Sequence, residues 1–474
     1  MKIYDKLYIN GEWREGCGDA VLANVNPYTG ETLYTYRSAG VKDIDDAYAA
    51  AAQAQKKWSA TTVAEKTEVF EKLLGVVREY APVIEDCLLT EGGSTLPKRK
   101  YEAATCAQMV RYFMQFPARA EGTILPSEIP GAMNYVFRKP RGVITVISPW
   151  NVPCLLALKS ILPAIALGNA VVMKPSSETP ASALVLAEIF EKAEMPAGLL
   201  NVVVGSGSEI GDRLVTHEQS DLVSFTGSTA VGSHIASLAG ERICDVSLEL
   251  GGNNAMLLLE DADTEAAADK AVFGAYFHQG QICMGLNRVI VVGDQYDAFC
   301  DALALRVRGL KAGSPEDADV FIGPLINDDQ VAKFEQAVQA SVREGARVLV
   351  GGKTDGRVIS PWLLADVTAD MTVVRREVFG PVCSVLRASS EEEAIRIVND
   401  TNYGLSGGVF SKDIYHAMQV ASRLESGMVH INDQPIGEEF HVMFGGEKQS
   451  GLGRFNGKWV LDKFTTEQWI AVNP

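Results

Sequence analysis

Apolar residues recur every three or four positions in the first quarter of the chain, with charged residues between them. This spacing is typical of amphipathic helices, which we expect at residues 41–60 and 63–80, with a further helical stretch at 90–119. Residues 133–139 instead alternate apolar and polar side chains, as a strand does. Together with residues 122–130, they predict a β hairpin that leaves the body of its domain.

From residue 142 onward, short continuous apolar runs alternate with helical segments. Strands are expected at residues 143–147, 170–174, 200–204 and 222–225, and helices at 153–167, 182–193, 209–216 and 230–239. A second series has strands near 254–259, 288–292 and 348–350, helices at 264–277 and 296–310, and a helical turn followed by a strand at 459–472. Strand–helix alternation of this period indicates an α/β fold with a parallel, doubly wound sheet.

The composition of the chain excludes several classes of partner. Of its 474 residues, 47% are hydrophobic and 22% charged, as in an ordinary globular enzyme. A prior of about 150 residues per domain suggests roughly three folding units. The net charge of −17 argues against a nucleic acid and against an anionic membrane surface. No apolar run is long enough to span a bilayer.

The positions of the cysteines and histidines indicate the redox state of the compartment and whether a metal site is expected. The eight cysteines are scattered without a CxxC motif, and the six histidines show no ligand spacing. This usage is typical of a reduced chain rather than of a disulfide scaffold or a zinc site. Residues 1–6 have neither an apolar signal core nor the composition of a transit peptide. We therefore expect a cytoplasmic protein without a bound metal.

Polar residues follow two of the predicted strands, where a doubly wound sheet binds its ligands. Asn151 comes after the strand at 143–147, and its amide can donate to a developing oxyanion. Taken alone, it is better explained as a turn residue before a helix. Lys174 and the hydroxyls after it suit an adenosine ribose and any phosphate on it, although a solvated lysine is as good an explanation.

Glycines mark two other strand ends. Gly227 and Ser228 stand where the strand at 222–225 passes into a helix, and the free amides of a helix N-terminus suit a pyrophosphate. Without a ligand, the segment is an ordinary capped turn. The cluster around Gly207 and Gly211 departs from GxGxxG because its third glycine comes one residue late. We interpret this cluster as a mainly structural loop near an adenine.

Cys283 and Glu249 form a pair suited to covalent catalysis. Cys283 ends the segment FHQGQIC, and Glu249 begins ELGGN. A nucleophilic thiol needs a polar or electropositive pocket to form its thiolate. Release of the covalent intermediate needs a base that activates water. The glycines in both segments let the backbone approach a ligand closely.

Seven segments in order, PWN, KPS, FTGS, ELGG, GQxC, ExFGP and FGGxKxSGxGR, resemble the aldehyde dehydrogenase superfamily between Tyr8 and Val472. The resemblance implies a Rossmann-type cofactor domain (residues 1–117 and 141–251) and an α/β catalytic domain (252–450). It also implies a small β oligomerisation element (118–140 and 451–474). An edge strand of that element would pair with another subunit, giving a homodimer or homotetramer.

The resemblance also assigns roles to residues. Cys283 becomes the nucleophile, Glu249 the general base and Asn151 the oxyanion donor. An aldehyde would form a thiohemiacetal on Cys283, give a hydride to NAD or NADP, and leave as the acid when a thioester is hydrolysed. The residues implied for cofactor binding are Ile147, Trp150, Lys174, Ser177, Gly207, Gly211, Gly227, Ser228, Leu250, Glu377 and Phe379.

One position departs from the family pattern. Many members have a Glu three residues after the Lys, where this chain has Ser177 and places its Glu one residue later, at Glu178. A carboxylate repels a 2′-phosphate, whereas a hydroxyl can donate a hydrogen bond to it. Ser177 beside Lys174 therefore predicts that the enzyme accepts NADP⁺, alone or alongside NAD⁺.

The substrate is predicted from a narrower resemblance. Residues 148–180 and 430–469 look most like the benzaldehyde and vanillin dehydrogenases, which suggests an aromatic aldehyde in an apolar funnel. Candidate walls, all of residue types that are more often core, are Tyr112, Phe113, Leu155, Ile282 and Phe444. No Arg is clearly placed to anchor a substrate carboxylate, so a semialdehyde is the alternative. A CoA-acylating enzyme would not need Glu249, and a non-catalytic structural homologue would be expected to have lost it or Cys283.

Overall fold

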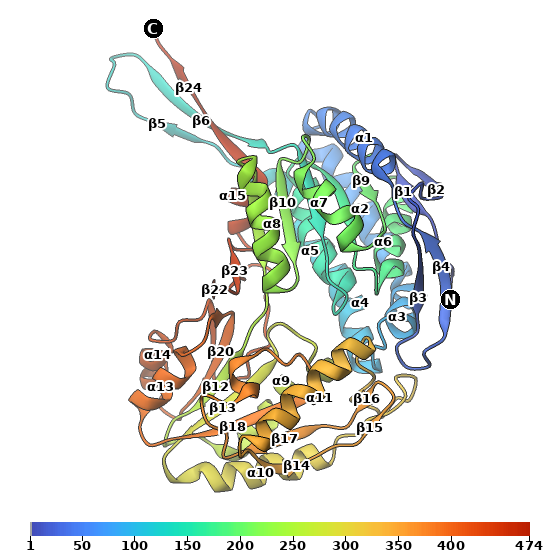
Figure 1. Ribbon diagram of the computed structural model, residues 1–474. Coiled ribbons are helices and arrows are strands. Elements are labelled where there is room, and N and C mark those ends of the chain that lie inside the picture. Colours follow the sequence, from blue (N-terminus) through green and yellow to red (C-terminus); the bar gives the residue numbers. More distant parts are fainter. Residues whose placement is uncertain (1) are drawn as a thin grey trace.

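The computed structural model describes residues 2–474, and Met1 lies outside it. Figure 1 shows two lobes and an arm. The first lobe contains an eight-stranded sheet, the second lobe a seven-stranded sheet, and the arm consists of three strands that project from the first lobe. Within residues 2–474, no helix is both long and apolar enough to cross a membrane.

Five parallel strands form the centre of the first lobe. They are β7 (Val143–Ile147), β8 (Ala170–Lys174), β9 (Leu200–Val202), β10 (Leu222–Thr226) and β11 (Asp245–Glu249), in the spatial order β9-β8-β7-β10-β11. The chain moves outward from β7 to β9 and then crosses to the other side of β7 for β10 and β11. The strand order therefore reverses between β7 and β10, which is where a doubly wound sheet binds its ligand.

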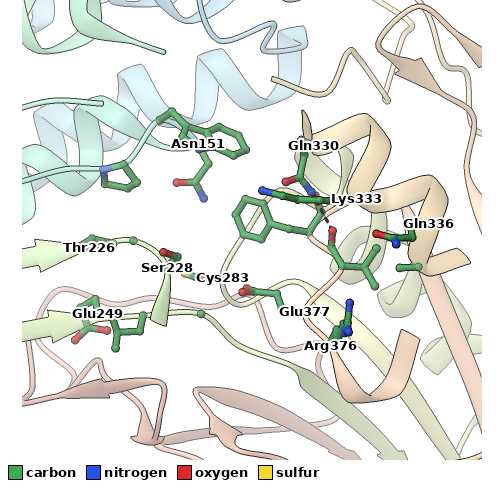
Figure 2. A pocket seen from close by; sticks show the side chains of 18 of the residues that line it. Asn151, Thr226, Ser228, Glu249, Cys283, Gln330, Lys333, Gln336, Arg376 and Glu377 are labelled. Atoms are coloured by element: carbon green, nitrogen blue, oxygen red, sulfur yellow. Dashed lines mark hydrogen bonds between the residues drawn. The ribbon is translucent and has the colours of Figure 1, made fainter. Parts of the chain in front are cut away.

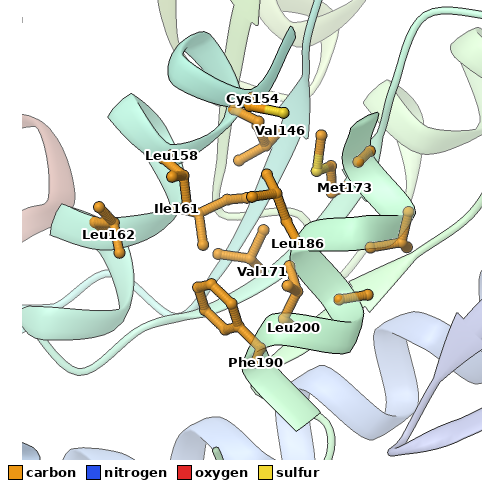
Figure 3. Close-up of a cluster of buried hydrophobic side chains, with 14 of the residues drawn as sticks. Val146, Cys154, Leu158, Ile161, Leu162, Val171, Met173, Leu186, Phe190 and Leu200 are labelled. Carbon is orange, nitrogen blue, oxygen red and sulfur yellow. The ribbon is translucent and has the colours of Figure 1, made fainter. Parts of the chain in front are cut away.

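Helices α5 (Pro153–Ala166) and α6 (Pro180–Lys192) fill the core of the first lobe. Every residue of α5 is buried, so this helix is apolar all round rather than amphipathic. Figure 3 shows Leu158 and Phe190 from the two helices beside Val171 of the sheet. Burying one such side chain contributes about 1.5–3 kcal/mol. The other helices of this lobe are α1 (Val41–Ser59), α2 (Val63–Glu79), α3 (Ala81–Thr90), α4 (Leu96–Phe113), α7 (Gly207–Thr216), α8 (Thr229–Glu241) and α15 (Trp459–Phe464).

The second lobe is built on a sheet whose strands are all parallel except β14. In spatial order they are β14 (Arg347–Val350), β17 (Trp362–Ala365), β18 (Val382–Ala388), β13 (Leu286–Val292), β12 (Asn254–Leu258), β20 (Ser406–Phe410) and β21 (Met428–Ile431). Its helices are α9 (Thr264–Tyr276), α10 (Tyr296–Arg308), α11 (Asp328–Arg343), α12 (Thr372–Arg375), α13 (Glu391–Asn399) and α14 (Ile414–Ala421). In Figure 1, α11 lies on the side of this lobe that faces the first lobe.

The arm joins segments that are far apart in the sequence. β6 (Met133–Pro140) pairs along its whole length with β24 (Thr465–Val472), and β5 (Thr123–Leu125) pairs with the other edge of β6. Figure 1 shows it extending away from both lobes. Its apolar side chains are therefore exposed; they include Ile124, Leu125, Ile129, Met133, Phe137, Trp469, Ile470 and Val472.

The α/β class, the parallel doubly wound sheets and the hairpin are confirmed. The helix predicted at residues 90–119 is wrong in extent: α3 ends at Thr90, a turn follows, and α4 runs only from Leu96 to Phe113. Gly93, with φ of +59°, ends the helical geometry there. The strand predicted at residues 200–204 ends at Val202. The remaining short strands, including β1 (Leu7–Ile9), β2 (Glu12–Arg14), β3 (Val21–Val25) and β4 (Thr32–Arg37), were not predicted.

A buried ion pair fixes the start of α5, directly after the segment that carries Asn151. Lys98 and Glu102 lie one turn apart on α4, and their side chains are paired at 2.6 Å with almost no exposure. The other oxygen of Glu102 accepts the backbone N–H groups of Cys154 (2.8 Å) and Leu155 (3.1 Å). Glu102 thus satisfies amides in the first turn of α5 that have no partner within the helix.

Replacing Glu102 by Ala is expected to lower the free energy of unfolding by about 3–5 kcal/mol, because it leaves the Lys98 charge buried without a partner. The measurement is urea unfolding followed by far-UV circular dichroism. Lys72→Ala, which removes an exposed ion pair with Glu194, should leave the midpoint almost unchanged. Equal midpoint shifts for the two variants would contradict this assignment.

Candidate active site

The strand reversal in the first sheet places three predicted site residues at one edge. β10 lies between β7 and β11, in parallel register with both. Asn151 lies in the loop after β7, Ser228 is the N-cap of α8 directly after β10, and Glu249 is the last residue of β11. Because the carboxyl ends of parallel strands meet at the same edge, these side chains come from separate segments to one place.

This edge opens into a cavity of about 690 Å³. Figure 2 shows Asn151 and Glu249 on one side and Lys333 and Glu377 of the second lobe on the other, with Cys283 between them. Of the other predicted cofactor residues, Trp150, Gly227, Ser228, Leu250 and Phe379 also line the cavity. The structure therefore brings the three predicted catalytic residues and six of the predicted cofactor residues to one cavity.

A constrained loop carries Cys283. After α9 the chain passes through His278, Gln279 and Gly280 with φ of 50°, 57° and 70°. Two non-glycine residues in this region cost roughly 1–3 kcal/mol each and persist only where the surroundings hold them. At Gly280 a side chain is excluded outright, because a Cβ would collide with the carbonyl oxygen of Gly380.

Hydrogen bonds from both sides hold this loop. Asn254 donates from Nδ2 to the carbonyl oxygen of Cys283 at 2.8 Å. The Gln281 side chain accepts the backbone N–H of Ile326 at 3.1 Å. The carbonyl of Gln281 accepts from Nδ2 of Asn151 at 2.8 Å. A carboxamide has two N–H donors, so Asn151 fixes the Cys283 loop with one and retains the other for a ligand in the cavity.

Glu249 is buried, and neither of its carboxyl oxygens has a hydrogen-bond partner among the described residues. Burial raises the pKa of Glu249 to about 8, and the nearby Glu438 adds to the effect, while Lys159, Arg454 and Lys463 oppose it. A carboxyl group with this pKa exchanges protons near neutral pH, as a general base must.

Burial also raises the pKa of the Cys283 thiol, to about 12, and the carboxyl groups of Glu377, Glu249 and Glu438 act in the same direction. Lys159 opposes them. The side chain is nevertheless partly accessible from the cavity. Without added positive charge, the thiol would be protonated at neutral pH, although the thiolate is the reactive form.

The β10–α8 junction has the shape expected of a pyrophosphate site. A Cβ at Gly227 would collide with the ring of Phe225, so this turn requires glycine, and Gly227 itself lines the cavity. Ser228 caps α8 by accepting from the backbone N–H of Val231 at 3.4 Å. The first-turn amides of α8 have no partners within the helix and carry the positive end of its dipole.

The wall opposite Asn151 carries the acid Glu377, and an aromatic pair bridges the two sides of the cavity. Glu377 accepts the backbone N–H of Gly252 at 3.1 Å, and burial raises its pKa to about 7. The rings of Trp150 and Phe379 meet edge to face, with centroids 5.5 Å apart. Together with the α8 terminus, this wall gives the cavity the mixed polar and aromatic lining that a dinucleotide needs.

Five predicted cofactor residues do not line the cavity, and their roles stay predictions: Ile147, Lys174, Ser177, Gly207 and Gly211. Lys174 ends β8, is buried, and donates to the carbonyl of Pro175 at 2.8 Å. Its pKa is lowered by burial to about 8. Gly207 and Gly211 lie on α7, and a Cβ at either would meet open space.

The predicted substrate funnel stays a prediction. None of its five candidate walls lines the 690 Å³ cavity. Phe113 is a core residue, fully buried with its ring 4.9 Å from that of Phe116. Leu155, Ile282 and Phe444 belong to the same buried core of the first lobe as Phe113, and Tyr112 and Cys283 pack against that core.

Two exposed cations at the cavity were missed from the sequence. Lys333 lies on α11, which was not predicted, although its apolar spacing Val331, Phe334 and Val338 after the N-cap Asn327 is a clear helix signal. Arg376 immediately precedes Glu377. Within residues 2–474, no ion pair or side-chain hydrogen bond is made by either Lys333 or Arg376, and both line the cavity.

Residues 13–470 match the model of the aldehyde dehydrogenase family. The chain belongs to this family. It is 44% identical over 470 residues to a vanillin dehydrogenase of Corynebacterium glutamicum, with 98% of this chain and 97% of that protein covered. It is 46% identical over 469 residues to a benzaldehyde dehydrogenase of Bacillus subtilis, with 99% and 97% covered. It is thus an NAD(P)-dependent aldehyde dehydrogenase.

Solved structures of aldehyde dehydrogenases match along nearly the whole chain. A NAD-dependent benzaldehyde dehydrogenase from Corynebacterium glutamicum superposes with a TM-score of 0.92 at 41% identity, covering 99% of this chain and 97% of that one. A salicylaldehyde dehydrogenase from Pseudomonas putida G7, complexed with salicylaldehyde, gives a TM-score of 0.96 at 33% identity, covering 99% and 98%. The predicted fold class is therefore confirmed at the level of this family.

Lys333 and Arg376 have no side-chain partner among residues 2–474, and both line the cavity of a chain of net charge −17. We therefore expect both to attract the anionic dinucleotide. Lys333→Gln and Arg376→Gln should each weaken NADH binding about two- to fivefold at low salt, and high salt should remove the difference. Fluorescence titration of NADH measures this. Arg375→Gln is the matched control, since Arg375 is paired with Asp400. Binding that is unchanged in both cavity variants would contradict the expectation.

Proposed function

We propose that this enzyme oxidises aromatic aldehydes to carboxylic acids through a covalent intermediate on Cys283. The observation that carries the proposal is the convergence of Cys283, Asn151 and Glu249 at one cavity that is also lined by polar and aromatic groups suited to a dinucleotide. The aromatic substrate class is supported by the 44% and 46% identity to vanillin and benzaldehyde dehydrogenases.

Each reacting side chain then has one task. The Cys283 thiolate attacks the carbonyl carbon, forming a C–S bond, and the second N–H of Asn151 stabilises the resulting oxyanion. A nicotinamide cofactor supplies the hydride acceptor when it is bound, and loss of the hydride from that carbon leaves a thioester on Cys283. Glu249 takes a proton from water, the resulting hydroxide attacks the thioester carbon, and the C–S bond breaks to release the acid and the thiolate.

For the cofactor, we propose that Lys174 and Ser177 bind the adenosine ribose and that Gly227 and Ser228 bind the pyrophosphate. Glu377 and Phe379 would border the nicotinamide ribose. The remaining predicted contacts are Ile147, Trp150, Gly207, Gly211 and Leu250. Lys174 suits its role because its ammonium has one carbonyl partner in the structure and therefore keeps donors for a ribose or a phosphate.

The substrate assignment is tested by steady-state kinetics with benzaldehyde, vanillin and succinic semialdehyde, following NAD(P)H at 340 nm. We expect kcat/KM to be at least about tenfold higher for the aromatic aldehydes, because Lys159, the cation beside Phe444, is already paired with Glu438 at 2.6 Å and is not free to meet a carboxylate. A preference for succinic semialdehyde would replace the proposal by the alternative of a semialdehyde dehydrogenase.

The cofactor preference depends on the residue three positions after Lys174. The neighbouring carboxylate, Glu178, is engaged elsewhere, because its Oε1 accepts from Asn327 at 3.1 Å. This leaves Ser177 as the group beside Lys174, and we expect NADP⁺ to be used. Ser177→Glu should lower kcat/KM for NADP⁺ about tenfold or more relative to NAD⁺, because a carboxylate repels the 2′-phosphate.

The matched control for that variant is Ser176→Glu, which adds the same charge one residue earlier. A wild-type enzyme whose kcat/KM for NADP⁺ is a thousandfold below that for NAD⁺ would contradict the interpretation of Ser177.

We further propose that the first lobe is the cofactor domain (residues 1–117 and 141–251), the second the catalytic domain (252–450), and the arm the oligomerisation element (118–140 and 451–474). The exposed apolar residues of the arm, among them Trp469 and Ile124, support a homodimer or homotetramer, since such a surface normally contacts another chain. All eight cysteines are free, which suits a cytoplasmic protein.

A further inference from the structure

A second buried ion pair lies beside the catalytic residues and has no role in the reaction as described so far. Lys159 is on the fully buried helix α5, and its Nζ lies 2.6 Å from Oε1 of Glu438, which is on the loop after β21. The two side chains are only 3% and 9% exposed. Removing two charges from water costs several kcal/mol per ion, so a stable core would be better served by apolar residues here.

The surroundings of the Lys159 ammonium bury it away from the cavity. Its Nζ lies 3.1 Å from the centre of the Phe444 ring, where a cation is attracted to the π face. Asn456 donates from Nδ2 to Oε1 of Glu438 at 2.8 Å, which fixes the carboxylate. The ammonium has almost no accessible surface and does not line the cavity. It can therefore act on the reaction only through its electric field.

The field of this ammonium reaches the two reacting groups. Phe444 belongs to the buried core of the first lobe, and Cys283 also packs against that core. The next residue, Gly445, approaches Glu249 so closely that a Cβ there would lie 3.3 Å from Oε1. Glu249 has no hydrogen-bond partner of its own among the described residues. The ammonium, the Phe444 ring and the Glu249 carboxyl group are thus neighbours in a water-poor region, where charges interact strongly.

Both positive and negative side chains affect the pKa values of Cys283 and Glu249. The charged groups that act on Cys283 are Glu377, Lys159, Glu249 and Glu438, and those that act on Glu249 are Lys159, Glu438, Arg454 and Lys463. Lys159 lowers the pKa of both the thiol and the carboxyl group, whereas Glu438 raises both. The two members of the ion pair therefore act in opposite directions on the same reaction.

We propose that Lys159 is a positioning residue of this enzyme: its charge favours the thiolate of Cys283 and the carboxylate of Glu249, and Glu438 limits how far it does so. The inference rests on the proposed roles of Cys283 and Glu249. If the ion pair were purely structural, removing either member would affect only folding. On the proposal, removing Lys159 raises the pKa of the Cys283 thiol, and removing Glu438 lowers it.

The experiment measures the pH dependence of Cys283 alkylation by iodoacetamide, followed by peptide mass spectrometry, without aldehyde or cofactor. Lys159→Met should move the midpoint to higher pH, and Glu438→Gln should move it to lower pH. If the midpoint moves by about one pH unit, the alkylation rate at a fixed pH below it changes about tenfold, because the thiolate is the nucleophile. Lys159→Arg should restore the wild-type midpoint.

Two further variants complete the design. The double variant Lys159→Met/Glu438→Gln removes both charges and should give a midpoint between those of the single variants. Lys66→Met is the matched control, since Lys66 is also a buried lysine over an aromatic ring, 5.5 Å from the centre of Trp58, but on α2. It should leave the midpoint unchanged.

Midpoints that move in the same direction in Lys159→Met and Glu438→Gln, or that move in neither folded variant, would overturn the proposal. If Lys159→Met does not fold, Glu438→Gln and the double variant decide. The alkylation uses no substrate, so its result is independent of the proposed function, which turnover of benzaldehyde tests separately. In turnover, the pH profile of kcat for Lys159→Met should move to higher pH, with recovery in Lys159→Arg.

Discussion

The parallel register of β7, β10 and β11 is the constraint on which the site depends. These three neighbouring strands end at one edge of the first sheet, and each ends next to a different group: Asn151, the proposed oxyanion donor; the α8 terminus with Ser228; and Glu249, the proposed base. A shift of one strand by one residue would turn its side chain to the other face of the sheet. The second lobe then has to supply only the nucleophile loop and the wall that contains Glu377.

Around the Cys283 thiol, carboxyl groups outnumber positively charged groups. The chain carries a net charge of −17, and three carboxyl groups raise the pKa of Cys283 above the value that burial alone would give. Positive charge is placed at two depths. Lys333 and Arg376 lie exposed at the cavity, the proposed dinucleotide site, while Lys159 is buried against the ring of Phe444. The exposed pair can assist binding, and the buried ammonium can assist the chemical step.

Much of this arrangement could be predicted from the sequence. Cys283, Glu249 and Asn151 could be selected from the sequence because glycine-rich turns and strand ends are recognisable from neighbouring residues alone. The order of the seven motifs indicated the family. Lys159 was not found, because it stands in a continuous apolar run, and only tertiary packing shows that the run passes beside the base. The funnel walls were predicted from residue type alone, and Phe113 shows the weakness of that step: it packs against Phe116 in the core.

The covalent bond to Cys283 is the central claim, and one measurement tests it most directly. Glu249→Gln enzyme is mixed with benzaldehyde and oxidised cofactor, quenched in acid after one turnover, digested, and analysed by mass spectrometry. We predict one equivalent of reduced cofactor and a benzoyl group on the peptide that contains Cys283. Reduced cofactor formed with that peptide unmodified, or turnover that persists in Cys283→Ala, would contradict the account.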